Sequence, residues 1–435
     1  MLTSNRIWIK NILMYKLSAL KNKLRIITYP MPHSHGVTSG IFVNVGSRFE
    51  TDKQAGISHF AEHMFYKGTK KRPTPADISR AIEAVGGYTN AATSQDYTFF
   101  YNRVPARHVH FALDFLADII NHSLFDQAAI KREKSVILEE LNMYLDTPTR
   151  YIYDLIMKTV WPDNSLGRDI IGRRASLAAV TRASFMPYLR NTYQPQNMVL
   201  AVAGQVSHAE VVQDAKKYFA RNKNGRLLKF KKVITGQTKA RVLIHSKTTD
   251  QAHLCLAVPA LPRGHQLENP LALLETILGG GMSSRLFLNI REKRGLCYYI
   301  NSFSEKFADT GIFGISAGLN TGKIQEAIKA ILAELDLISR VKVSQAELNK
   351  AKEYLSGNIR LQLDSTENMA IYYGSQALFY QRIKTPEQRI KELLQVKEND
   401  IMALARKLFQ KNRFNLAVIG PFKQSADKKF LKLLN

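Results

Sequence analysis

The chain has 435 residues, of which 45% are apolar and 23% are charged, so its composition is that of a folded globular protein and excludes a disordered or fibrous one. This length allows two or more domains, each with its own core. Lys and Arg number 62 against 36 Asp and Glu, but the basic residues are scattered along the chain without an aromatic and basic RNA-binding signature, which argues against specific nucleic-acid binding.

Cysteine usage and the apolar runs narrow the class of protein further. Cys255 and Cys297 form no C-x-x-C pair, so neither a disulfide framework nor a cysteine metal site is predicted, as in a reducing compartment. No apolar run approaches the roughly 20 residues of a membrane helix, and no span is predicted. Residues 1–13 lack a continuous apolar core, so a secretory signal is not expected. They contain no acidic residue, which leaves a short transit-like segment or a true start at Met14 as the alternatives.

Strand and helix patterns alternate along the first half of the chain. Runs rich in β-branched and apolar residues predict strands at 24–29, 39–45, 97–104 and 198–204. Apolar residues at helical spacing and helix-start signals predict helices at 75–85, 109–120, 127–145 and 182–192. This mixture predicts an α+β fold.

The second half of the chain repeats features of the first. Residues 193–204 match residues 409–420 at an offset of 216, and residues 127–130 match 345–348 at an offset of 218. A chance similarity between two strand endings is the alternative explanation. The second match argues against it, because each matching segment opens a long predicted helix, and both halves begin with a strand pair followed by a helix.

We therefore expect two homologous domains. The first is predicted to span residues 14–220 and the second residues 240–435. Residues 221–239 between them are rich in lysine and turn formers, which is typical of a linker.

The segment 56–66 carries the clearest chemical signal. His59 and His63 are four residues apart, on one face of a helix, where both imidazoles can reach one metal ion. Glu62 lies beside them and can accept a proton from a metal-bound water. The inverted order H-x-x-E-H therefore indicates a zinc hydrolase, with a surface histidine pair on an amphipathic helix as the alternative.

A catalytic zinc ion takes a third protein ligand, and the predicted helix 127–145 offers candidates. Glu133 and Glu140 are seven residues apart and share a face, whereas Glu139 points about 100° away from Glu140. Acidic residues on such a helix are usually solvated, so spacing alone does not select the ligand.

Five segments together carry a family resemblance. They are GISHFAEHMFYKGT at 56–69, GGYTNAATSQDYTFFY at 86–101, EKSVILEELNMYLDTP at 133–148, SLGRDIIG at 165–172 and GGGMSSRLFLNIREKRGLCYY at 279–299. They resemble the M16 family of inverzincin metallopeptidases, which includes the mitochondrial processing peptidase, pitrilysin and insulin-degrading enzyme. The resemblance implies two homologous domains, each a mainly antiparallel sheet packed with helices, and a zinc endopeptidase that cleaves unfolded peptides or short polypeptides in a closed chamber.

The resemblance also assigns roles to residues of the first half. It implies one zinc ion per chain, held by His59, His63 and Glu140, with Glu62 as the general base and Glu133 supporting the site. Asn90 and Ala91 would lie on an edge strand that binds the substrate backbone, a common mode of peptide recognition. Without the resemblance, Asn90 favours a turn.

In the second half, Arg291 and Tyr298 match the family's R-x6-Y motif, whose two residues contact the substrate and the polarised carbonyl. A tyrosine hydroxyl is a suitable donor to a developing oxyanion. Without the resemblance, Arg291 is expected on the surface and Tyr298 in a strand core. Residues 279–281 lack the G-K-[ST] ending of a phosphate loop and predict a flexible turn.

The repeat offset places no metal ligands in the second half, since the counterparts of the two histidines fall near Glu275 and Gly279. Two domains are half of the four-domain enclosure of longer family members, so the resemblance implies a dimer of identical or related chains. Arg291 and Tyr298 would then act on the partner chain's zinc.

The resemblance leaves three further points. A non-catalytic partner subunit is the alternative function, because some family members have lost the metal site. The expected location is the bacterial cytoplasm, with the mitochondrial matrix as the alternative. Asn164 stands where relatives commonly have histidine, and no consequence is predicted from it.

Overall fold

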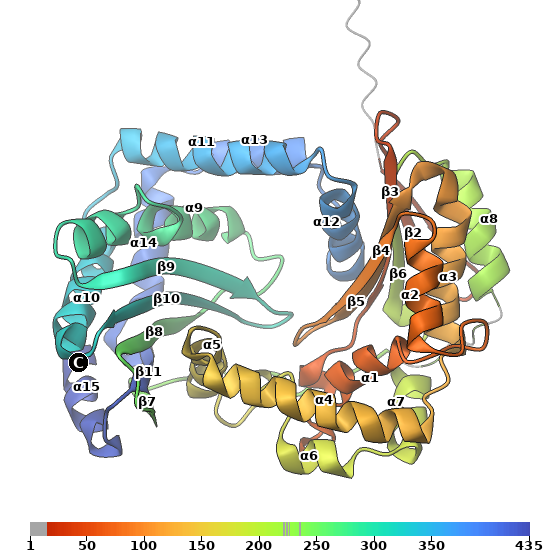
Figure 1. Ribbon diagram of the computed structural model, residues 1–435. Helices are drawn as coiled ribbons and strands as arrows, with labels where there is room; N and C mark the ends of the chain where they lie inside the picture. The colour runs from red at the N-terminus through yellow and green to blue at the C-terminus, as the bar shows by residue number, and fades with distance from the viewer. Residues whose placement is uncertain (1–14, 221, 223–224, 226, 235) are drawn as a thin grey trace, which may run out of the picture.

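The computed structural model describes residues 15–220, 222, 225, 227–234 and 236–435. The segment 1–13, the start at Met14 and part of the proposed linker therefore lie outside the described residues. Two β-sheets, one in each half of the chain, are surrounded by helices (Figure 1).

The first sheet has six strands in the order β1-β2-β6-β3-β5-β4. Their bounds are β1 (Lys16–Ala19), β2 (Arg25–Pro30), β3 (Gly36–Val43), β4 (Tyr88–Thr93), β5 (Thr98–Pro105) and β6 (Met198–Gly204). Strands β2 and β6 are parallel and all other neighbours are antiparallel. The four strands predicted from sequence correspond to β2, β3, β5 and β6, with ends that differ by at most three residues.

The second sheet has five strands in the order β7-β11-β8-β10-β9. Their bounds are β7 (Arg241–Ser246), β8 (Gln251–Ala260), β9 (Cys297–Lys306), β10 (Gly311–Asn320) and β11 (Asn415–Gly420). Taken in chain order, β7 to β11 have the same neighbours as β2 to β6, including one parallel pair. The predicted duplicated α+β fold is confirmed.

Fifteen α-helices are described around the sheets. Their bounds are α1 (Ile57–Phe65), α2 (Pro75–Glu83), α3 (Val109–His122), α4 (Gln127–Asp146), α5 (Pro148–Val160), α6 (Arg174–Ala179), α7 (Arg182–Thr192), α8 (His208–Phe219), α9 (Glu268–Gly279), α10 (Ile324–Arg340), α11 (Gln345–Gln362), α12 (Thr366–Phe379), α13 (Pro386–Leu394), α14 (Glu398–Leu408) and α15 (Asp427–Leu434). None of the described helices is both long and apolar enough to cross a bilayer. The four helices predicted from sequence correspond to α2, α3, α4 and α7.

The long helices α4 and α11 begin in the same way. Asp126 before α4 accepts a hydrogen bond from the backbone N–H of Ala129, and Ser344 before α11 accepts one from Glu347. These caps satisfy backbone donors that have no partner within the helix. In Figure 1, α4 runs along one side of the space between the two sheets and α11 along the other, so each carries the chain from one half towards the other.

The helices that follow α4 and α11 are exchanged between the halves. Helix α5 packs on β8 and β11 of the second sheet, where Ile152 and Ile156 are buried against Ala257 and Ile419. Helix α12 packs on β3 and β6 of the first sheet, and its Tyr373 belongs to a separate buried cluster there. The proposed boundary at 221–239 thus separates the two sheets in sequence, while the packing of α5 and α12 crosses it.

Gly280 and Gly281 lie in a bend after α9, where a turn is predicted, whereas Gly279 belongs to the helix. Gly279 is the last residue of α9, and a Cβ on it would lie 2.3 Å from the backbone nitrogen of Ser302 in β9. Glycine is required there because the helix end and the strand approach each other too closely for any side chain.

Gly374 and Gly357 form a matched pair for testing the helix exchange. A Cβ on Gly374 in α12 would lie 2.1 Å from Phe42 of the first sheet, whereas nothing lies within 4 Å of one on Gly357 in α11. We expect Gly374→Ala to lower the free energy of unfolding by about 1–3 kcal/mol through overpacking. Gly357→Ala is expected to raise it by about 0.5–1 kcal/mol, because alanine is favoured over glycine within a helix. Urea unfolding measures both, and a stabilising Gly374→Ala would contradict the packing.

Candidate metal centre and active site

The start of helix α1 is fixed by its surroundings. Gly56, which precedes the helix, has φ of +91°, a left-handed conformation that favours glycine, and a Cβ on it would lie 2.5 Å from the carbonyl oxygen of Ile171. The Glu50 carboxylate accepts hydrogen bonds from the backbone N–H groups of Gly56 and Ser58, both at 2.8 Å. An anion at a helix N-terminus is favourable. Burial raises the pKa of Glu50 to about 7, although these hydrogen bonds oppose the shift.

Two histidines of α1 and one glutamate of α4 converge. The imidazole rings of His59 and His63 have centroids 4.7 Å apart. Glu140 faces both, with Oε1 at 3.7 Å from Nε2 of His59 and Oε2 at 3.4 Å from Nε2 of His63. One donor atom from each residue lies within 4.8 Å of the other two. Among the described residues this is the only such group, so the described part of the second half contains none.

The donor set fits zinc. Two imidazoles and one carboxylate are the ligands of many catalytic zinc sites, in which a fourth position is open to water. The Oε2 atom of Glu140 and the Nδ1 atom of His59 are buried without a hydrogen-bond partner. A buried carboxylate oxygen without a donor is unfavourable unless a cation compensates it.

The protonation states of His59 and Glu140 also suit a metal. Burial lowers the pKa of His59 to about 4, and the charge of His63 adds to this, so His59 is a neutral imidazole at pH 7. Neutral imidazole is the form that binds metal. Burial acts to raise the pKa of Glu140, but the neighbouring histidines outweigh it and lower the pKa below its ordinary value. Glu140 is therefore a carboxylate.

Glu133 contacts Nδ1 of His63, and Lys67 in turn pairs with Glu133. Oε1 of Glu133 lies 2.8 Å from Nδ1 of His63, and Oε2 lies 2.8 Å from Nζ of Lys67. Burial lowers the pKa of His63, but the hydrogen bond to Glu133 and the negative charge of Glu140 outweigh it and raise the pKa to about 9. A carboxylate on Nδ1 directs Nε2 towards the metal. Sequence reasoning did not identify Lys67, although it lies only four residues after His63.

Glu62 is held by a residue that the sequence did not single out. Its Oε2 accepts a hydrogen bond from the hydroxyl of Thr93, the last residue of β4. Burial raises the pKa of Glu62, and the hydrogen bond from Thr93 opposes this rise. Thr93 lies in the segment 86–101, and the alternating polar residues of this segment are the feature of the sequence that could have indicated it.

Glu139 lies apart from this group. Its side chain is exposed, and its described hydrogen bond is to Nδ2 of Asn142 at 3.4 Å. The register of α4 therefore turns Glu140 towards α1 and Glu139 towards solvent.

Asn90 and Ala91 lie in β4, the edge strand of the first sheet next to α1. The turn favoured by Asn90 alone is wrong, since Asn90 pairs with Tyr101 of β5. The hydroxyl of Tyr66 donates to the carbonyl of Asn90 at 3.1 Å, and the Asn90 side chain accepts from the N–H of Ala91 at 2.8 Å. The side chains of Tyr66 and Asn90 thus cover parts of this edge.

Arg291 and Tyr298 lie together but apart from the metal residues. Arg291 belongs to the π-helix η6 (Phe287–Glu292), and its guanidinium carbon lies 5.7 Å from the Tyr298 ring centroid. Tyr298 is 74% exposed, at the start of β9, so the strand core expected for it is wrong. In Figure 1, β9 starts on the side away from α1. Within the described residues, no hydrogen bond, ion pair or ring contact joins this pair to the metal residues.

A cavity of about 500 Å³, lined by polar and apolar residues, lies between the two halves. Its lining includes Thr93 of β4, Asp154 of α5 and Glu305 of β9. Burial raises the pKa of Asp154 to about 7, and the carboxylates of Asp169 and Glu305 add to this shift. Thr93 lines this cavity and donates a hydrogen bond to Glu62, so the cavity lies next to the residue that holds the candidate base.

Asn164 anchors the linker. Its Oδ1 accepts a hydrogen bond from the N–H of Leu166 at 3.0 Å, and its Nδ2 donates to the carbonyls of Lys231 and Lys232 at 3.3 and 3.1 Å. The asparagine that departs from the family pattern therefore has a structural contact in this chain.

Neighbouring glutamates of α4 test the ligand assignment. We expect Glu140→Gln to lose bound zinc, because it removes one of three ligands, and Glu139→Gln to keep it. Glu133→Gln is expected to weaken zinc affinity by about 10- to 100-fold, because His63 loses the group that orients it. Chelator competition followed by metal analysis measures this series. Zinc retained by Glu140→Gln and lost by Glu139→Gln would reverse the assignment.

Both halves of the chain match known protein families. Residues 25–174 match the family described as insulinase (peptidase family M16), and residues 179–355 match peptidase M16 inactive domain. An uncharacterized zinc protease of Bacillus subtilis, YmxG, is 35% identical over 412 residues, which cover 94% of this chain and 98% of that protein. An uncharacterized zinc protease of Rickettsia felis is 34% identical, with 94% and 98% covered.

Solved structures share the fold. A protease from Helicobacter pylori superposes with a TM-score of 0.89 at 22% identity, covering 94% of this chain and 99% of that one. A peptidase M16 inactive domain from Pseudomonas fluorescens superposes with a TM-score of 0.87 at 18% identity, covering 94% and 98%. The resemblance seen in the sequence is confirmed: the chain belongs to the zinc proteases of peptidase family M16.

Proposed function

We propose that this chain is a zinc-dependent endopeptidase that hydrolyses peptide bonds in unfolded peptides or short polypeptides. The observation that carries the proposal is the position of Glu62. It lies between the ligands of α1 and is held by Thr93 at the edge of the cavity between the halves. A general base in this place can reach a water molecule at the open metal position.

The chain's residues divide the chemical work. His59, His63 and Glu140 would hold a zinc ion, which would supply Lewis-acid chemistry to a water molecule and to the substrate carbonyl. Glu62 takes the proton of the attacking water and returns it to the leaving amine. Glu133 orients His63, and the Thr93 hydroxyl orients Glu62.

The site favours extended substrates. An extended peptide can add to the edge strand β4 through backbone hydrogen bonds, next to Asn90 and Ala91. The cavity wall carries charges of both signs, since Arg263 and Lys306 line it together with Asp154 and Glu305.

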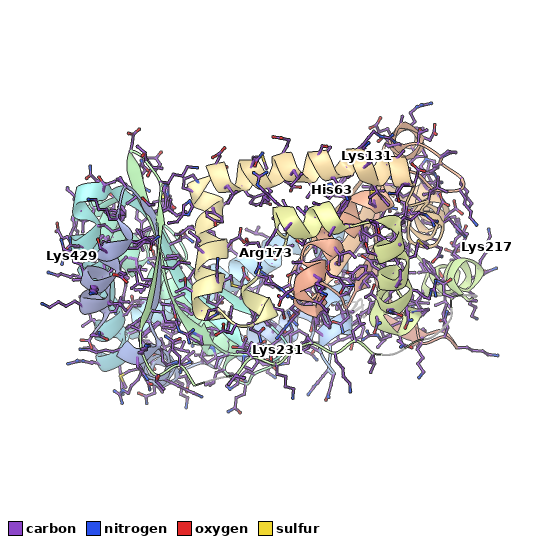
Figure 2. The ribbon with its side chains drawn as sticks, turned by 90° about the horizontal axis from the view of Figure 1, so that it is seen from below. His63, Lys131, Arg173, Lys217, Lys231 and Lys429 are labelled. Carbon is purple, nitrogen blue, oxygen red and sulfur yellow. The ribbon has the colours of Figure 1, made fainter. Side chains whose placement is uncertain are left out.

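The two alternative functions have less support. A non-catalytic partner subunit has no need of three convergent ligands with a buried base beside them. Specific nucleic-acid binding needs a concentrated basic surface. Figure 2 shows basic side chains spread from Lys429 at one end of the molecule to Lys217 at the other, with Lys231 and Arg173 between them.

Substitution of the base tests the proposal. We expect Glu62→Gln to bind zinc with unchanged stoichiometry, because none of the three ligands is altered, and to lose about 10²- to 10⁴-fold in cleavage rate. The measurement is mass spectrometry of a peptide library incubated with each protein, with a chelator-treated sample as control. Cleavage by Glu62→Gln at the original rate would refute the assignment of the base.

The separation of the two parts of the site suggests a dimer. Tyr298 lies at the exposed start of the edge strand β9, and Arg291 lies in the π-helix before it, without a described contact to the zinc ligands of their own chain. We propose that they complete the site of a second chain, identical or related, where Tyr298 donates a hydrogen bond to the developing oxyanion. Each site would then contain residues of both subunits.

Mixing two inactive variants tests this arrangement. In a mixed dimer of Glu62→Gln and Tyr298→Phe chains, one site contains an intact Glu62 and an intact Tyr298. We expect the mixture to recover up to about one quarter of the unchanged activity, since half of the dimers are mixed and each has one intact site. Sedimentation confirms the dimer, and no recovery in a mixture shown to exchange subunits would contradict action across the interface.

A further inference from the structure

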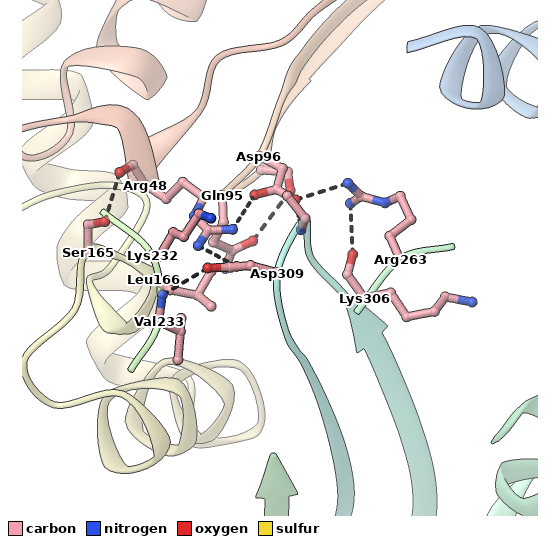
Figure 3. Close-up of polar contacts among 12 residues, drawn as sticks. Arg48, Gln95, Asp96, Ser165, Leu166, Lys232, Val233, Arg263, Lys306 and Asp309 are labelled. Carbon is pink, nitrogen blue, oxygen red and sulfur yellow. Dashed lines mark hydrogen bonds and ion pairs between the residues drawn. The ribbon is translucent and has the colours of Figure 1, made fainter. Parts of the chain in front are cut away.

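Four charged residues form a buried cluster where the two halves meet (Figure 3). This junction cluster consists of Arg48, Asp96, Arg263 and Asp309. Nη1 of Arg48 lies 3.1 Å from Asp96, and Nη2 lies 2.7 Å from Asp309. Nη1 of Arg263 lies 3.1 Å from the second oxygen of Asp96. Asp96 is therefore held by one arginine from each half of the chain.

The two halves of the chain contribute structurally equivalent residues to the junction cluster. Asp96 lies in the turn between β4 and β5, and Asp309 lies in the equivalent turn between β9 and β10. Arg48 follows β3 and Arg263 follows the equivalent strand β8. The tips of the two edge hairpins thus meet at this point.

Burial makes the geometry of the cluster specific. The side chains of Arg48 and Asp96 are 0% and 3% exposed. The backbone N–H of Ala308 donates to Asp96 at 3.1 Å, and that of Val233 in the linker donates to Asp309 at 2.8 Å. Two positive and two negative charges balance, and buried charges are tolerated only when paired and hydrogen-bonded in this way.

An aromatic ring packs against each of the two arginines of the cluster. The guanidinium of Arg48 lies 3.8 Å from the ring centroid of Phe230, and that of Arg263 lies 3.7 Å from the ring of Phe379 at the end of α12. Cations are attracted to aromatic faces at such distances. Phe379 belongs to the exchanged helix, so the cluster is tied to the packing between the halves.

Asp96 lies in the turn that directly follows Thr93, the residue that holds the candidate base. Residues 94–97 follow Thr93, whose hydroxyl donates to Glu62. The backbone N–H groups of Ser47 and Arg48 donate to the carbonyls of Ser94 and Gln95, each at 3.1 Å. The turn is therefore fixed by backbone contacts on one side and by Asp96 on the other.

We propose that Asp96 is a positioning residue for Glu62, through the turn 94–97 and the hydroxyl of Thr93. The two arginines on Asp96 come from different halves, so the contact between the halves determines where Thr93 lies. Base orientation and docking of the halves are thereby coupled. The inference rests on the proposed role of Glu62.

A double-mutant cycle separates positioning from mere stability. The assay is the hydrolysis of an internally quenched peptide that the unchanged zinc-loaded chain cleaves. We expect Asp96→Asn to lower kcat by about tenfold or more, because small misplacements of a reacting group cost up to about 10²-fold. In a Thr93→Ala background, Asp96→Asn should lower kcat no further. Thr93→Ser keeps the hydroxyl and should restore sensitivity to Asp96→Asn.

Asp309→Asn is the matched control. It removes the same charge from the same arginine, but its turn carries no residue bonded to Glu62. We expect kcat close to that of the unchanged protein. If Asp96→Asn does not fold, Arg263→Gln replaces it in the cycle, because this variant keeps the pair between Arg48 and Asp96 and removes the charged contact from the second half.

Hydrogen exchange supplies a readout that does not depend on activity. Backbone amides of residues 93–97 should exchange faster in Asp96→Asn and Arg263→Gln, with and without zinc, and should be unchanged in Asp309→Asn. Additive losses of kcat, or an unchanged exchange rate in this turn, would overturn the inference. If Glu62→Gln keeps the full rate, the proposed function fails as well; if Glu62→Gln is inactive and the losses add, only the positioning role fails.

Discussion

Each sheet in this fold has one face covered by a helix from the other half of the chain. Helix α5 covers part of the second sheet and α12 covers part of the first, and the buried apolar cluster at each contact contains residues from both halves. Burial of apolar side chains is the main favourable contribution to folding. The two halves therefore share two of their apolar clusters, and neither sheet is fully covered by its own half.

This exchange also sets the position of the candidate site. Glu140 lies on α4, which leads through Thr147 and Pro148 into α5. Proline at the first position of α5 suits a helix start, because its missing N–H would have no partner there. The packing of α5 on the second sheet thus fixes the far end of the helix that presents Glu140 to α1. The wall carrying Asp154 comes from the same exchanged helix.

Local pattern predicted four strands of the first sheet and four of the helices around it, and distant contacts account for the functional contacts that it missed. The spacing of His59, Glu62 and His63 identified the metal chemistry because the three share one short helix. The choice of Glu140 over Glu139 needed the resemblance, since it depends on how α4 is rotated against α1. The roles of Thr93 and Asp96 were not visible in the sequence, because both act through residues at least 31 positions away.

The second half shows why the duplicated framework holds no second site among its described residues. Helix α9 takes the place of α1, and its Glu275 accepts a hydrogen bond from the Ser304 hydroxyl of β9 at 2.5 Å. Gly279 occupies the position one turn later, where α9 lies against Ser302 too closely for a side chain. The space that a ligand would need is filled by strand β9 itself. The same close packing holds β9 in place, and with it the exposed start of the strand where Tyr298 lies.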